Sequence, residues 1–139
     1  MKAKISWLDG ARMSGESGSG HQITIDGPES IGGRNQGMRP MELMLMSVGA
    51  CSTVDVISIL QKARQDVTDC VVEVAGERVD AVPAVFEKIH LHFLVSGNNL
   101  DAKKVIRAVE LSAEKYCSAS IMLSKAGVLL THSVEIIAA

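Results

Sequence analysis

The sequence has very few aromatic residues. Aromatics make up 3% of the 139 residues, with one Trp, one Tyr and two Phe. Proteins that bind single-stranded nucleic acid stack the bases on aromatic side chains, and this chain offers too few for such a surface. Hydrophobic residues nevertheless make up 47% and charged residues 22%, a balance that excludes an intrinsically disordered chain. The interior must therefore be filled mainly by aliphatic residues and by the seven Met.

The sequence also lacks a basic stripe and a long apolar run. The net charge is −2, and interspersed Lys and Arg provide no surface that neutralises a run of phosphates. No uninterrupted apolar run reaches the roughly 20 residues that a membrane span needs. The N-terminus has the pattern of a charged strand and not of a signal peptide. We therefore expect a cytoplasmic protein whose partners include neither nucleic acid nor a membrane.

Cysteine is scarce as well. Three Cys without a secretory signal do not form a small disulfide framework. They lie outside any CxxC motif or other metal-spaced cluster, so the spacing predicts no metal site. Each Cys is interpreted either as a buried small hydrophobic residue or as a reactive thiol.

The hydropathy pattern predicts a single α+β domain over residues 1–139, because a chain of this length supports one ordinary core. Several segments alternate polar and apolar residues as half-buried strands do. Strands are expected at residues 2–8, 21–26, 67–79, 87–95 and 128–137. We expect them to form an antiparallel sheet of about six strands around a long buried central helix.

That long helix follows Pro40, which is tolerated as a first helical residue. Between Glu42 and Asp55 the sequence has no charge, so the helix is apolar nearly all round and should run through the interior. A second helix is expected from about Asp101, and a third over residues 118–127, which end at a glycine. One sheet can cover only one face of the long helix. We therefore predict an obligate homodimer in which the long helices of two copies pack centrally.

Two segments next to the long helix indicate a ligand site. Residues 27–37 carry four Gly and one Pro, which predicts a mobile or tightly turned loop that serves as a lid or substrate entry. Four methionines crowd into the following stretch: Met38, Met41, Met44 and Met46. Flexible Met suits a surface that accepts apolar ligands of varied shape, and it equally fills a core that is short of aromatics. Both interpretations stay open.

Two cysteine-containing segments are distinctive enough to compare with known protein families. The first is RPMELMLMSVGACSTVDVISIL, which holds Cys51, and the second is AEKYCSAS, which holds Cys117. With these motifs the chain resembles, over its whole length, the OsmC/Ohr family of thiol-dependent hydroperoxide reductases and its YhfA-like branch. The third cysteine, Cys70, is interpreted as a spare.

The resemblance implies an intertwined homodimer with its sites at the subunit interface. Cys51 matches the family's peroxidatic thiol, which attacks an organic hydroperoxide and becomes a sulfenic acid. Cys117 matches the resolving thiol, which forms a disulfide with Cys51 that an external dithiol reductant reduces. An apolar channel lined by Met41 and Met44 selects alkyl or lipid hydroperoxides, with Arg39 within reach of the site. The resemblance implies no cofactor and no metal, and it implies a role in oxidative stress defence.

The sequence departs from the family's pattern at the charged positions that activate the thiol. Met41 stands where active members have Glu. Glu42 lies nine residues before Cys51, which places it on the opposite helix face. The family's arginine is matched only by candidates, among which Arg39 has the shortest reach; the others are Arg12 and Arg34. Asp55, one turn beyond Cys51, is expected to oppose thiolate formation.

These departures keep two other hypotheses open. One is a non-catalytic dimer that binds a small molecule or lipid in the same apolar pocket, and the other is a structural dimer with buried Cys. Ser47 is a candidate donor to a thiolate, although a helical Ser more often bonds its own backbone. His90 and His92 share one side of a strand, but with His21 and His132 they show no metal-ligand spacing.

Overall fold

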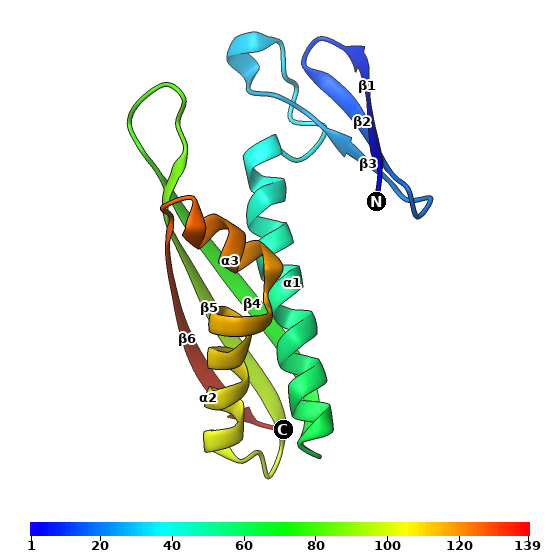
Figure 1. The fold of residues 1–139 in the computed structure, drawn as a ribbon. Helices are drawn as coiled ribbons and strands as arrows, with labels where there is room; N and C mark the ends of the chain where they lie inside the picture. The colour runs from blue at the N-terminus through cyan, green and yellow to red at the C-terminus, as the bar shows by residue number, and fades with distance from the viewer. The chain divides into compact units, whose positions relative to one another are not determined.

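The computed structural model describes residues 1–139, which form two compact units, Met1–Met44 and Leu45–Ala139. Each unit holds a three-stranded sheet (Figure 1). The α+β class is confirmed. The sheet arrangement differs from the prediction, because the strands form two sheets of three in place of one sheet of about six. That residues 1–139 act as a single domain stays a prediction.

The first unit is an antiparallel meander in the order β1-β2-β3. Its strands are β1 (Ala3–Asp9), β2 (Arg12–Ser17) and β3 (Gln22–Ile25), followed by the short helix η1 (Glu29–Ile31). The β1–β2 turn needs a positive φ, which Gly10 adopts at 48°. The indole of Trp7 donates a hydrogen bond to the Gly10 carbonyl across this turn.

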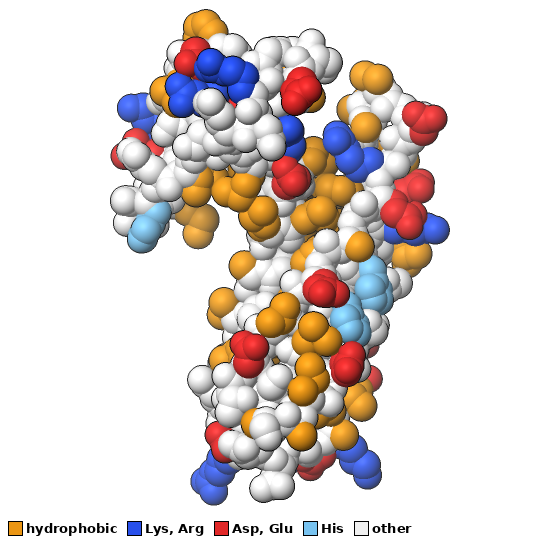
Figure 2. Space-filling view, turned by 180° about the vertical axis from the view of Figure 1, so that it is seen from behind, with side chains coloured by type: hydrophobic (Ala, Val, Ile, Leu, Met, Phe, Trp, Pro, Cys, Tyr) orange, Lys and Arg blue, Asp and Glu red, His pale blue; other side chains and the backbone are white.

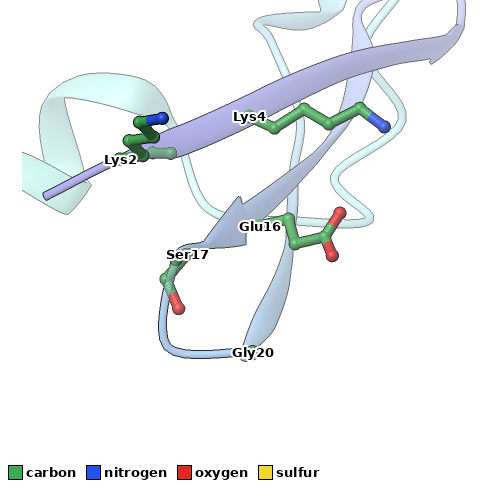
Figure 3. Close-up of a pocket in the computed structure, with 7 residues that line it drawn as sticks. Lys2, Lys4, Glu16, Ser17 and Gly20 are labelled. Atoms are coloured by element: carbon green, nitrogen blue, oxygen red, sulfur yellow. The ribbon is translucent and has the colours of Figure 1, made fainter.

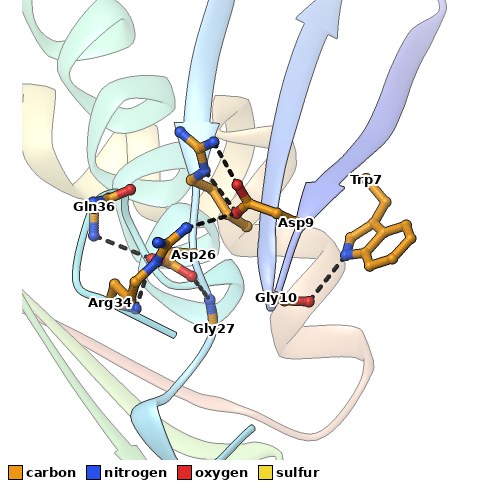
Figure 4. A network of polar contacts seen from close by, with 8 residues as sticks. Trp7, Asp9, Gly10, Asp26, Gly27, Arg34 and Gln36 are labelled. Atoms are coloured by element: carbon orange, nitrogen blue, oxygen red, sulfur yellow. Dashed lines mark hydrogen bonds and ion pairs between the residues drawn. The ribbon is translucent and has the colours of Figure 1, made fainter. Parts of the chain in front are cut away.

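The glycine-rich loop after β3 is tightly turned around one buried carboxylate. Asp26 is 1% exposed and accepts backbone N–H groups from Gly27, Arg34 and Gln36 at 2.9 to 3.1 Å (Figure 4). These hydrogen bonds hold the pKa of Asp26 below its usual value. The tightly turned interpretation of residues 27–37 is confirmed, whereas a role as lid or entry stays a prediction.

The second unit contains a sheet in the order β4-β5-β6. Its strands are β4 (Asp66–Arg78), β5 (Phe86–Asn98) and β6 (Leu129–Ala138). β4 and β5 form an antiparallel hairpin, but β6 runs parallel to β5. The expectation of a fully antiparallel sheet is therefore wrong. Parallel pairing needs a crossover connection, which here consists of α2 (Ala102–Leu111), a π-helical turn η2 (Ser112–Tyr116) and α3 (Ser118–Lys125).

All three helices of this unit cover one face of the sheet (Figure 1). Alternate β5 residues face them and are buried, among them Ile89, Leu91, Phe93 and Val95. A small cavity at this interface is lined by Ser52 of α1, Val109 of α2 and Ser120 of α3 together with Leu91 and Phe93. No helix of this unit covers the other face of the sheet, where acidic and His side chains gather (Figure 2).

The long helix α1 (Pro40–Lys62) buries only one stripe within the chain. The buried residues are Val48, Gly49, Ser52, Val56 and Leu60, which recur at about one turn and face the sheet. The opposite face is exposed, with Val54 at 69% and Met46 at 49%. We expected α1 to be buried on every side, but within one chain only one side of the helix is buried.

By length and composition alone, α1 is also able to cross a membrane. From the sequence we did not identify α1 as long and apolar enough to span, because we looked for an uninterrupted apolar run. The Ser, Thr and Gly residues that interrupt the helix barely lower its mean hydropathy. The core helix of a globular protein meets the same criterion, and Val48, Val56 and Leu60 of α1 are buried within the chain.

Candidate functional site

Three chemically active side chains meet inside the second unit. The sulfur atoms of Cys51 and Cys117 and a carboxylate oxygen of Asp55 all lie within 4.8 Å of one another. Cys51 and Asp55 stand one turn apart on α1, and Cys117 immediately precedes α3. Cys117 is fully buried, whereas Cys51 and Asp55 are partly exposed. The two cysteines that the motifs singled out therefore form a close pair.

The position of Cys117 is set by the end of the helix before it and the start of the helix after it. The π-helical turn ends as the Cys117 N–H donates to the Ser112 carbonyl at 2.8 Å. Cys117 then takes the N-cap position of α3, where its sulfur accepts the Ser120 N–H at 3.4 Å. An N-cap acceptor satisfies one of the free N–H groups at a helix start, so the sulfur replaces the usual oxygen.

Several donors converge on the two sulfurs. The Ser52 hydroxyl donates to Cys117 Sγ at 3.2 Å. Burial alone would raise the pKa of the Cys117 thiol, but hydrogen bonds from Ser120, Ser52 and Cys51 outweigh it and lower that pKa. The start of α3 therefore stabilises negative charge on Cys117, as helix N-termini do for thiolates.

Cys51 has the opposite balance. Burial raises the pKa of its thiol, and the hydrogen bond to Cys117 and the negative charge there raise it further, against the N–H groups of Ala119 and Ser118. Of the two thiols, the buried Cys117 therefore loses its proton more readily than the more exposed Cys51 does.

Asp55 lies at the open side of this pair. The Ser112 hydroxyl donates to Asp55 Oδ2 at 3.1 Å and lies 3.4 Å from the Ser52 carbonyl. None of the ion pairs in the structure includes Asp55. A surface groove runs past it, lined by Asp55, Ser58, Ile59, Lys62, Leu111 and Tyr116. The carboxylate expected from the sequence is thus beside the thiols.

The predicted substrate residues Met41, Met44 and Arg39 belong to the other unit, Met1–Met44, so their role stays a prediction. The Arg39 guanidinium donates hydrogen bonds to the Asn35 side-chain oxygen and to the Gly37 carbonyl. The backbone N–H of Arg39 donates to the carboxylate of Glu42. Glu42 therefore serves as a helix cap.

The other two candidate arginines, Arg12 and Arg34, both pair with Asp9 at 2.9 Å. These pairs lower the pKa of Asp9, chiefly through Arg12, and Asp9 in turn raises the pKa of Arg12 (Figure 4). Within their unit these cations are committed to an acidic partner. At the thiol pair itself, backbone N–H groups from the start of α3 lower the pKa values of the sulfurs.

The remaining sequence candidates lie outside the thiol site. Burial, and to a smaller extent the negative charge of Asp69, raises the pKa of the Cys70 thiol on β4. This fits its interpretation as a spare cysteine. His90 and His92 do share a side of β5, and both contact the Ser133 hydroxyl on the face of the sheet that no helix covers. A shallow hollow of the first unit is lined by residues such as Lys2, Lys4 and Glu16 and holds no thiol (Figure 3).

Sequence reasoning missed the serines of the site. Ser52, Ser112 and Ser120 are all buried and hydrogen-bond within it. Ser120 could have been found from the Cys117-Ser-Ala-Ser pattern, because an N-cap acceptor bonds the N–H two or three residues later. Ser112 carries no such signal, since its place depends on the π-helical turn.

The chain is similar to known proteins over its whole length. The profile of the family described as OsmC-like protein matches residues 33–133. The chain is 50% identical over 139 residues to Protein YhfA of Escherichia coli K12, with all of both chains covered. A hypothetical protein of Aquifex aeolicus VF5, solved by crystallography, is 32% identical with a TM-score of 0.86, over 99% of this chain and 96% of that one.

A more distant solved structure shares the fold. An organic hydroperoxide resistance protein of Legionella pneumophila is 17% identical with a TM-score of 0.70, over 96% of this chain and 95% of that one. At this identity the likeness establishes the fold alone.

Proposed function

Because the chain belongs to the OsmC-like protein family, we propose that it is a cytoplasmic, homodimeric thiol peroxidase that reduces organic hydroperoxides in oxidative stress defence. The observation that carries the proposal is the close pairing of a partly exposed Cys51 with a buried Cys117 whose sulfur accepts hydrogen bonds. The hydroperoxide resistance protein of Legionella pneumophila with the same fold supports the substrate class.

The first step uses both sulfurs. Cys117 accepts the proton of Cys51, and the resulting Cys51 thiolate attacks the distal peroxide oxygen. The O–O bond breaks as the S–O bond forms, and the leaving alkoxide takes the proton from Cys117 to become an alcohol. Cys51 is then a sulfenic acid and Cys117 is again a thiolate. Cys51 is assigned as the attacking thiol because Cys117 is fully buried.

The second step closes the cycle. The Cys117 thiolate attacks Cys51 sulfur, a disulfide forms, and hydroxide leaves and is protonated to water. An external dithiol then reduces the disulfide and is itself oxidised to a disulfide. In the whole cycle the hydroperoxide and the external dithiol yield an alcohol, water and the oxidised dithiol, which conserves atoms and electrons without a bound cofactor.

The homodimer is proposed on the exposed apolar face of α1. Val54 is 69% exposed, and a groove along this face is lined by Ala50, Thr53, Val54, Ile57, Ser58 and Gln61. An apolar face of this length on a soluble chain marks an association surface. In the proposed dimer, Met41, Met44 and Arg39 line the substrate channel.

The proposal is tested by following the thiols during peroxide treatment. The reduced protein is mixed with cumene hydroperoxide or hydrogen peroxide, and thiol loss is measured by mass spectrometry. A Cys51–Cys117 disulfide should form faster with the organic peroxide. Cys51→Ser should abolish oxidation. Cys117→Ser should form the sulfenic acid more slowly and stop there, because it lacks both the proton acceptor of the first step and the resolving thiol. Cys70→Ser is the control that leaves both steps unchanged. Thiols that remain reduced at millimolar peroxide would exclude the peroxidase.

A second candidate function is a non-catalytic dimer that binds an apolar small molecule or lipid. Asp55 beside the thiols and Met41 in the family's Glu position favour it, because both weaken thiolate activation at Cys51. An apolar ligand that copurifies with an oxidation-resistant protein would select this candidate.

A further inference from the structure

The cluster of Cys51, Cys117 and Asp55 contains a carboxylate in addition to the two thiols that dithiol redox chemistry uses. A carboxylate next to two thiols opposes the charge that redox chemistry needs on sulfur. The peroxidase proposed above assigns no role to Asp55. The same three groups, two soft sulfurs and one carboxylate oxygen, are ligands that Zn²⁺ accepts.

The separations suit a single metal ion. A tetrahedral Zn²⁺ with Zn–S bonds of about 2.3 Å holds its sulfurs roughly 3.8 Å apart. The three ligand atoms here already lie within 4.8 Å of one another. Coordination of one ion therefore needs the separations between the ligand atoms to shorten by about 1 Å.

The backbone also presents the ligands in a fixed arrangement. Cys51 and Asp55 lie four residues apart on α1, the spacing that puts two side chains on one helix face. Cys117 approaches from α3, where the Ser120 N–H and the Ser52 hydroxyl already bond its sulfur. Ser112 holds Asp55 through its hydroxyl. Outer hydrogen bonds of this kind orient ligands in metal sites.

One side of the cluster remains open. Asp55 borders the surface groove that runs past Lys62 and Tyr116, so an ion can enter and water can occupy a fourth position. The cluster has no ion-pair partner for Asp55, and a divalent cation compensates the charge of two thiolates and a carboxylate better than a single Lys does.

We propose that the reduced protein binds one Zn²⁺ per chain through Cys51, Asp55 and Cys117, with a solvent molecule as the fourth ligand. Binding requires both sulfurs as thiolates, so disulfide formation between them excludes the metal. The ion and the hydroperoxide therefore compete for the same sulfurs. The metal site is independent of the peroxidase: it stands whether or not the thiols turn over peroxide.

The test titrates the reduced full-length protein with Co²⁺, a spectroscopic substitute for Zn²⁺, under anaerobic conditions. Thiolate-to-cobalt charge-transfer bands and the visible bands of tetrahedral Co²⁺ should saturate at one ion per chain, and Zn²⁺ should displace Co²⁺ and remove them. Replacing either sulfur, in Cys51→Ser or Cys117→Ser, should reduce the charge-transfer intensity by about half or abolish it. Cys70→Ser is the matched control and should bind as the wild type does.

Asp55→Asn separates this site from adventitious binding by thiols. The amide keeps the size of the side chain but removes an anionic ligand oxygen. Loss of an outer-shell partner alone costs about tenfold or more in metal affinity, so the loss of a ligand should weaken Zn²⁺ binding at least as much, with circular dichroism confirming that the variant folds. Charge-transfer bands that are absent in the wild type, that survive in Asp55→Asn with unchanged affinity, or that disappear in Cys70→Ser would overturn the proposal. Peroxide turnover, measured on metal-free protein, reports separately on the proposed peroxidase.

Discussion

Ser52 supplies the side-chain hydroxyl that stabilises charge on Cys117. Hydrogen bonds to charged groups contribute about 1.5 kcal/mol or more, which corresponds to roughly tenfold in the thiolate population. Ser52→Ala removes the 3.2 Å bond to Cys117 Sγ and should therefore raise the pKa of that thiol. The thiolate absorbance in the ultraviolet, followed against pH, measures the shift.

The control for this variant is Ser118→Ala. Ser118 is exposed and contributes its backbone N–H, which alanine keeps. A titration that moves equally in both variants, or in neither, would contradict the role assigned to the Ser52 hydroxyl.

Asp26 links the pH dependence of stability to the glycine-rich loop. Its pKa is lowered in the folded chain by the N–H groups of Arg34, Gln36 and Gly27. The stabilisation is therefore fully present above the ordinary Asp pKa and is lost as the pH falls through the lower, folded value. Asp26→Asn should be less stable than the wild type at neutral pH and should lose less stability on acidification.

Urea unfolding over a pH series measures this difference. Asp80→Asn, at an exposed position between β4 and β5, serves as control and should follow the wild type. If Asp26→Asn showed the same acid sensitivity as the wild type, the lowered pKa would not be the source of it.

Among the elements, α1 and β4 approach each other at a glycine. A Cβ on Gly49 would lie 2.8 Å from a methyl carbon of Val74. Gly49→Ala therefore overpacks this contact, at about 1–3 kcal/mol, against a gain of up to about 1 kcal/mol in helix propensity. We expect a net loss of roughly 1 kcal/mol in the free energy of unfolding, measured by chemical denaturation.

A double-mutant cycle isolates the contact. In a Val74→Ala background the methyl group is gone, so Gly49→Ala should become neutral or stabilising. If Gly49→Ala lowered the free energy of unfolding equally in the wild type and in Val74→Ala, the contact with Val74 would not be the cause of the destabilisation.

The elements differ in how far the sequence reveals them. Helix α2 begins directly after Asp101, as predicted, and Gly127 follows α3 with φ 98°. Both ends are found because helix caps are local hydrogen-bonding signals, and the Asp101 side chain does accept the N–H groups of Lys103 and Lys104. The direction of β6 was not predictable, since alternation reports which face is buried and not which way a strand runs. Cys51 and Cys117 were found from their motifs, whereas Ser112 depends on a π-helical turn that no local pattern specifies.

At the scale of the whole molecule, the proposed homodimer depends on the exposed face of α1. In the proposed homodimer Val54 is buried, and Val54→Asp would place an uncompensated charge there at about 3 kcal/mol. The dimer dissociation constant should rise roughly a hundredfold. Sedimentation velocity over a concentration series measures it.

Val82→Asp is the control for association, because Val82 is fully exposed in the loop between β4 and β5. This variant should associate as the wild type does. A wild-type protein that stays monomeric at micromolar concentration would end the dimer proposal.

The parallel pairing of β5 with β6 also governs the order in which the thiol pair is assembled. The β4–β5 hairpin joins neighbours in sequence and closes quickly, whereas β6 pairs only after the chain from Asn99 to Val128 has crossed the sheet. Cys117 lies within that crossover. We therefore expect the two sulfurs to meet late in folding, so that a newly made chain passes through a period in which its cysteines react as separate thiols.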